Sequence, residues 1–95
     1  MQTEPDAGTA LVAKALVPYN QKPDEVEIAL LTDDLLCYGA ALARRAAGRE
    51  RATAAMRDWD LLTSHGPTDS PVGNWNHARA LARTVKAFRR ALGEQ

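Results

Sequence analysis

The densest group of side chains that could do chemistry lies at positions 73–79, which read Gly-Asn-Trp-Asn-His-Ala-Arg. Within two helical turns it offers two amides, an indole, an imidazole and a guanidinium, which can bind substrates or move protons. Trp75 and Arg79 are four residues apart, so in a helix the guanidinium can stack on the indole. Arg79 and Arg83 share that spacing and could together hold a carboxylate. The alternative is a capped helix start with a core tryptophan and solvated arginines.

Other reactive residues are scattered. Cys37 is the only cysteine and lies near an apolar stripe, so we expect a small buried hydrophobic residue rather than a nucleophile. His65 follows a predicted helix, and a helix-ending histidine without function is the simpler interpretation. Asp33 and Asp34 interrupt an apolar helix, and one of them must approach its seam. They form a solvated edge, a salt bridge to basic residues of the last helix, or a functional acid in a pocket.

Known catalytic motifs are absent from the sequence. It has no glycine-rich phosphate loop, no nucleophile elbow and no cluster of histidines and cysteines that would hold a metal. We therefore expect neither a metal nor a cofactor. No apolar run approaches the ~20 residues of a membrane span, and no basic region followed by an apolar segment opens the chain. The expected compartment is the cytoplasm.

Four helices would position the candidate residues: about 9–17, 24–47, 49–64 and 71–92, in a single domain over 1–95 with 1–8 disordered. Two of them carry apolar seams with 3-4 spacing. The seam of the second helix is widened by Leu30, Cys37 and Ala41 and consists of Ile28, Leu31, Leu35, Tyr38 and Leu42. The seam of the last helix is extended backward by Trp75 and consists of Ala78, Leu81, Val85, Phe88 and Leu92.

Residues that end or cap helices support these boundaries. Pro18 should end the first helix, and acidic residues at 24–27 should begin the second. Gly48 and the run His65-Gly66-Pro67 should end the second and third. Ser70 followed by Pro71 should cap the last, with Asn74 as the alternative cap. The predicted fold is all-α, a small bundle of three to four helices completed by dimerisation.

Charge is segregated along the chain, although the total is zero. Residues 1–43 hold two lysines and seven acids, a net −5, whereas residues 44–95 hold ten basic and five acidic residues, a net +5. Two interpretations are open. Acidic and basic helices lie side by side and neutralise each other, or one helix face binds an anion or an acidic partner through its basic residues Arg79, Arg83, Lys86 and Arg90. The balanced total and the lack of a DNA-reading motif argue against nucleic acid.

The stretch 70–87, Ser-Pro-Val-Gly-Asn-Trp-Asn-His-Ala-Arg-Ala-Leu-Ala-Arg-Thr-Val-Lys-Ala, resembles the C-terminal helix of short actinobacterial proteins of natural-product gene clusters. The order of an acidic start, a leucine-rich helix and an alanine/arginine-rich helix is also similar over roughly 24–92. Within that set, the chain resembles the proteins that form the lysinoalanine cross-link of cinnamycin- and duramycin-type lanthipeptides.

That resemblance implies a small, dimeric, cofactor-free enzyme that binds a modified peptide and adds a lysine amine to a dehydroalanine. Such a reaction needs a near-attack geometry and stabilisation of an enolate rather than a catalytic motif. The resemblance implies that His77 and Arg79 are the catalytic residues. The substrate-binding candidates are Asn74, Trp75, Asn76, Arg83 and Trp59. The rival hypotheses are a non-catalytic helical interaction or regulatory protein and, third, an anion- or DNA-binding accessory domain.

Overall fold

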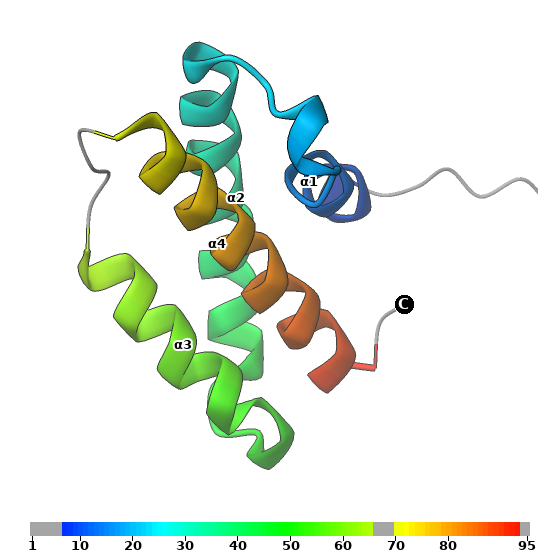
Figure 1. Cartoon of the computed structure of the whole chain (residues 1–95). Helices are drawn as coiled ribbons and strands as arrows, with labels where there is room; N and C mark the ends of the chain where they lie inside the picture. The colour runs from blue at the N-terminus through cyan, green and yellow to red at the C-terminus, as the bar shows by residue number, and fades with distance from the viewer. Residues whose placement is uncertain (1–6, 66–69, 94–95) are drawn as a thin grey trace, which may run out of the picture.

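Four α-helices and two short 3-10 turns make up the computed structural model, which describes residues 7–65 and 70–93 (Figure 1). They are α1 (Ala7–Ala15), η1 (Tyr19–Gln21), α2 (Glu25–Ala46), η2 (Glu50–Ala52), α3 (Thr53–Ser64) and α4 (Pro71–Ala91). The all-α prediction and its four helices are confirmed. The third helix begins with the 3-10 turn η2 rather than as α-helix. The first begins at Ala7, inside a segment expected to be disordered, and residues 1–6 of that segment lie outside the described residues.

Helix boundaries follow the capping residues. The Asp24 side chain accepts a hydrogen bond from the backbone N–H of Glu27 at 2.8 Å and begins α2. Ser70 accepts from the N–H of Gly73 at 3.1 Å and begins α4, as predicted, so Asn74 is not the cap. Gly48 follows α2 with φ +82°, a conformation that suits glycine. The predicted stop at Gly66-Pro67 lies outside the described residues.

Helix α4 is the centre of the fold (Figure 1). It crosses α2 and has α1 on one side and α3 on the other. Its predicted seam is fully buried at Trp75, Ala78, Leu81, Val85 and Phe88, and Leu92 at its end is half-buried. Because this apolar seam packs against α1, α2 and α3, few apolar residues of α4 remain exposed.

Trp59 of α3 joins the core at the crossing with α2. Its ring meets the ring of Phe88 edge-on, with centroids 5.8 Å apart. It also covers the backbone of Gly39, where a Cβ atom would overlap the indole. Gly39 thus permits the close approach of α3 to α2, although its backbone angles are ordinary for a helix.

The stripe of α2 is narrower than the sequence predicted. Cys37 is exposed, and Leu30 is 60% exposed, so the expectation that both widen the buried stripe is wrong. They share a helix face with Val26, which is 70% exposed. Their face turns away from α4, and α2 buries only the side that carries Ile28 and Leu35. Within the described part of the chain, no helix is both long enough and apolar enough to cross a membrane.

Candidate functional site

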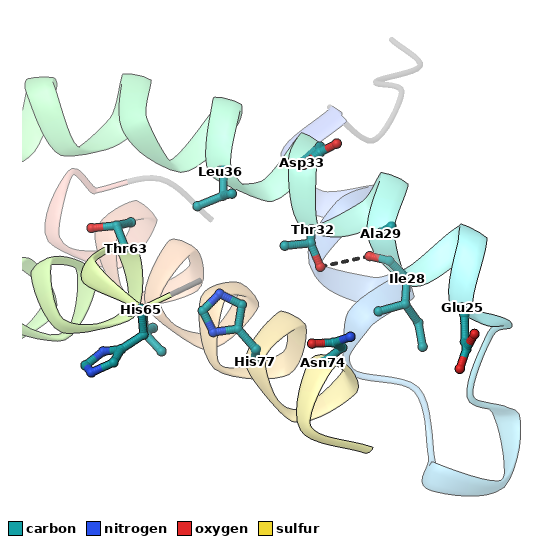
Figure 2. A pocket seen from close by; sticks show the side chains of 11 residues that line it. Glu25, Ile28, Ala29, Thr32, Asp33, Leu36, Thr63, His65, Asn74 and His77 are labelled. Atoms are coloured by element: carbon teal, nitrogen blue, oxygen red, sulfur yellow. Dashed lines mark hydrogen bonds between the residues drawn. The ribbon is translucent and has the colours of Figure 1, made fainter. Parts of the chain in front are cut away.

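A cavity of about 240 Å³ lies between α2, the end of α3 and the first turns of α4 (Figure 2). Helix α2 forms one wall, and the opposite wall is formed by α4, which carries the candidate residues of positions 73–79. The lining residues are Glu25, Ile28, Ala29, Thr32, Asp33, Leu36, Leu62, Thr63, His65, Asn74 and His77. The wall is thus mostly apolar with a few polar groups, which is the usual make-up of a ligand site.

His77 is the titratable group at the centre of this wall. It is half-buried, and its ring points from α4 toward α2 (Figure 2). Burial, and secondarily the positive charge that His65 can carry, lower its pKa below the ordinary value of 6.5. No other described residue forms a hydrogen bond with its ring nitrogens. At neutral pH, His77 is therefore an uncharged imidazole whose unprotonated nitrogen can accept a proton.

Among the described residues, two carboxylates and no lysine or arginine line the same cavity. Glu25 and Asp33 come from α2 and are both exposed, so they lie where the cavity meets solvent. Glu25, Asp33 and Asp34 form no ion pair with any described residue. The predicted alternative of a salt bridge from Asp33 or Asp34 to the last helix is therefore not found in the described part of the chain. The cavity consequently favours a positively charged ligand over an anion.

The hydroxyl groups in the cavity are engaged within their own helices. Thr32 Oγ1 donates to the carbonyl of Ile28 at 2.8 Å, and Thr63 Oγ1 donates to the carbonyl of Trp59 at 2.8 Å. His65 Nδ1 lies 2.8 Å from the carbonyl of Leu61, at the end of α3, and its ring turns away from His77 (Figure 2). These contacts match the simpler interpretation of His65 as a helix-ending residue and leave His77 as the proton acceptor.

Arg79 lies on another side of α4, against α1. Its Nη1 donates to the carbonyls of Val17 at 2.7 Å and Ala15 at 3.2 Å. Its guanidinium carbon is 5.6 Å from the centre of the Trp75 ring, which confirms the predicted stacking. The last carbonyls of a helix lack hydrogen-bond donors within the helix, and Arg79 is the donor for those at the end of α1. Arg83 lies instead beside Asp58 and Leu62, so the two arginines do not share a carboxylate site.

The other predicted substrate-binding residues are divided between core and surface. Asn74 lines the cavity with His77. Trp75 is fully buried, with no hydrogen-bond acceptor for its indole N–H among the described residues, and Trp59 is 8% exposed. Asn76 and Arg83 are exposed. The structure thus brings together two of the seven predicted residues, Asn74 and His77, and places the two tryptophans in the core.

The comparisons with known proteins identify the family. A family of unknown function, DUF6415, matches residues 6–95. The chain belongs to DUF6415. The search of curated proteins and that of solved structures gave no match. Membership of DUF6415 does not identify a biosynthetic family and carries no reaction with it, so function has to be argued from the site.

Sequence reasoning missed most of the cavity of this DUF6415 chain. The wall formed by α2 was not predicted, because Glu25, Thr32 and Leu36 carry no motif. The one usable signal was Asp33, a poor helix former next to an apolar seam, for which a pocket was among the open alternatives.

Among the described residues, no group of three or more histidines, cysteines and acids could hold a metal ion.

Proposed function

We propose that the cavity between α2, α3 and α4 binds a primary amine of a peptide, and that His77 takes a proton from it. One observation carries the proposal: among the described residues, the cavity combines an imidazole kept neutral by burial with two carboxylates and no basic side chain except the histidines. An amine enters as an ammonium ion, because its pKa of about 10.4 is well above neutrality. Glu25 and Asp33 attract that ion at the entrance of the cavity, and the apolar wall further in lowers the pKa of the ammonium toward that of His77.

The specific reaction that we propose is addition of a lysine amine to a dehydroalanine of the same modified peptide. The lysine ammonium gives one proton to His77, the neutral Nζ then forms a bond to the dehydroalanine Cβ as the Cα=Cβ π bond breaks, and the resulting enolate takes one proton at Cα from water or from the protonated His77. The product has the mass of the substrate. Asn74 lines the same wall and carries an amide that can polarise the carbonyl conjugated to the dehydroalanine double bond. The resemblance of residues 70–87 supports this choice of substrate.

Cross-linking of a dehydrated peptide tests the reaction. The purified protein is incubated with a peptide that contains one lysine and one dehydroalanine, and the ring is detected by lost fragmentation between the two residues. We expect cross-linking that is faster than in buffer alone, and we expect His77→Gln to slow it about a hundredfold or more, the lower end of the range for general base catalysis. His65→Gln, the matched control, should keep most of the rate. Equal rates with His77→Gln and wild type, or no cross-linking above buffer, would refute the proposed reaction.

A second candidate function is that of a non-catalytic interaction protein, with the homodimer expected from the sequence as its assembly. The supporting observation is the apolar face of α2, where Val26 and Leu30 are 70% and 60% exposed and lie one turn apart. Light scattering after size-exclusion chromatography distinguishes the states. A dimer that Val26→Asp with Leu30→Asp converts to a monomer supports this function, whereas a monomer at high micromolar concentration excludes the homodimer.

A further inference from the structure

A second, larger cavity lies on the opposite side of α4 from His77. It runs between α1 and the C-terminal half of α4 and reaches η2 at one end, and its volume is about 830 Å³. We call it the α1/α4 groove. It is lined by Thr9, Val12, Ala13, Leu16, Arg51, Lys86, Arg89, Arg90 and Gly93. Its volume lies in the range of small-molecule sites, which is about 300–1,000 Å³.

Every charged residue that lines the groove within 7–65 and 70–93 is basic. Arg51 of η2 and Lys86 and Arg90 of α4 are exposed, and none has an ion pair within the described part of the chain. Surface cations are normally interspersed with acids, whereas here they converge on one hollow. Charges of one sign that line a cleft with low-dielectric walls concentrate counter-ions there.

Arg89 gives the groove a fixed charged group. Its side chain is only 6% exposed, and its Nη1 donates to the hydroxyl of Tyr38 on α2 at 3.4 Å. Tyr38 in turn packs over Gly8 of α1, where a Cβ atom would overlap its ring. Tyr38 thus connects Arg89 to α2 and α1, and this guanidinium lies at the wall of the groove beside the exposed Arg51, Lys86 and Arg90.

The remaining wall is apolar. Val12, Ala13 and Leu16 of α1 line it, and Val12 and Leu16, one helical turn apart, are both half-buried. An inorganic anion would leave this surface wet, whereas a hydrocarbon group attached to the anion would cover it. We propose that the α1/α4 groove binds a small organic anion, a phosphate ester or carboxylate that carries an aliphatic chain. This proposal goes beyond the amine site and does not depend on it, since the two cavities share no residue.

Binding of octyl phosphate tests the proposal, with inorganic phosphate and 1-octanol as probes for each half of the ligand. Titration calorimetry gives the affinities and amide chemical shifts give the location. We expect octyl phosphate to bind roughly tenfold or more tightly than either probe, because burying two or three methylene groups suffices for that gain. Raising NaCl from about 0.05 to 0.5 M should weaken the binding. The shifts should lie in α1 and in α4 after Val85.

Two triple variants with equal loss of charge provide the control. Arg51→Gln with Lys86→Gln and Arg90→Gln removes the exposed cations of the groove, and we expect it to weaken octyl phosphate binding by roughly tenfold or more. Arg44→Gln with Arg49→Gln and Arg57→Gln removes three exposed arginines that do not line it, and should leave binding within about twofold. Circular dichroism confirms that both variants fold.

Three results would overturn the proposal. The first is octyl phosphate binding no tighter than inorganic phosphate. The second is equal binding by the two triple variants. The third is saturation of the groove by an acidic peptide under conditions where octyl phosphate gives no shifts, which would identify the groove as a peptide-binding surface instead. If the groove triple variant fails to fold, Lys86→Glu alone takes its place, and unchanged affinity in that variant would contradict the proposal equally.

Discussion

Arg79 should contribute more to stability than any other exposed or half-buried arginine of the described chain. Its Nη1 makes a short hydrogen bond to Val17, a longer one to Ala15, and its guanidinium stacks on Trp75. A hydrogen bond from a charged donor contributes about 1.5–3 kcal/mol, and a cation–π contact about 0.5–1 kcal/mol near the surface. Because Arg79 is half-buried, we take the lower values and expect Arg79→Ala to cost about 2–3 kcal/mol.

Thermal and urea unfolding measure this loss. In a domain of this size, 1 kcal/mol shifts Tm by about 4–8 °C, so Arg79→Ala should lower Tm by about 10–20 °C. Arg79→Lys should recover only part of the loss, since an ammonium lacks the planar fork that stacks on an indole while bonding to carbonyls. Hydrogen exchange should become faster first in α1, because the lost bonds hold the end of that helix.

Arg83→Ala is the matched control for Arg79→Ala. Arg83 is exposed, lies one turn later on the same helix, and should change stability by about 0.5 kcal/mol or less. If the two alanine variants unfold at the same temperature, the contacts of Arg79 do not stabilise α1 and our reasoning is wrong. If Arg79→Ala keeps the wild-type Tm but abolishes cross-linking, Arg79 has the catalytic role that the resemblance implies.

Three further outcomes follow from the core and the cavity. Gly39→Ala should lower the free energy of unfolding in urea by about 1–3 kcal/mol, because the added Cβ overlaps Trp59. The same substitution should lower it less in a Trp59→Phe background, and equal losses in the two backgrounds would exclude that clash. His65→Gln should raise the pKa of His77 in an NMR titration while leaving it below 6.5, because burial is the larger cause; no change would remove His65 as a cause. Stability should fall as the pH drops from about 6.5 toward the folded-state pKa of His77, because the unfolded chain binds more protons there, and His77→Gln should flatten this dependence.

The sequence predicted the helices because their signals are local. The seam of α4 repeats at helical spacing, and Asp24 and Ser70 cap helices through backbone groups three residues away. It did not predict which face of each helix is covered. Cys37 and Leu30 look like core residues in the pattern of α2, but a domain with only three neighbouring helices cannot cover that face.

The candidate site was predicted only where it is contiguous in sequence. Asn74 and His77 are three residues apart and do face one cavity, whereas Arg79, two residues beyond His77, points to another side of the same helix. Glu25 and Asp33 come from a different helix, and their place at the edge of the cavity that His77 lines depends on how α2 crosses α4. A crossing of two helices has no signature in either sequence segment, so the acidic rim could not be predicted.

The most direct test of the account is an NMR titration of the His77 ring with n-butylamine at neutral pH, with butyrate as a control of opposite charge. Butylamine should shift the His77 ring resonances saturably at about millimolar concentration, as expected for so small a ligand. Glu25→Gln with Asp33→Asn should abolish the shift, and butyrate should give none. A shift with butyrate that equals or exceeds that with butylamine, or no shift with butylamine at all, would contradict an amine site at His77.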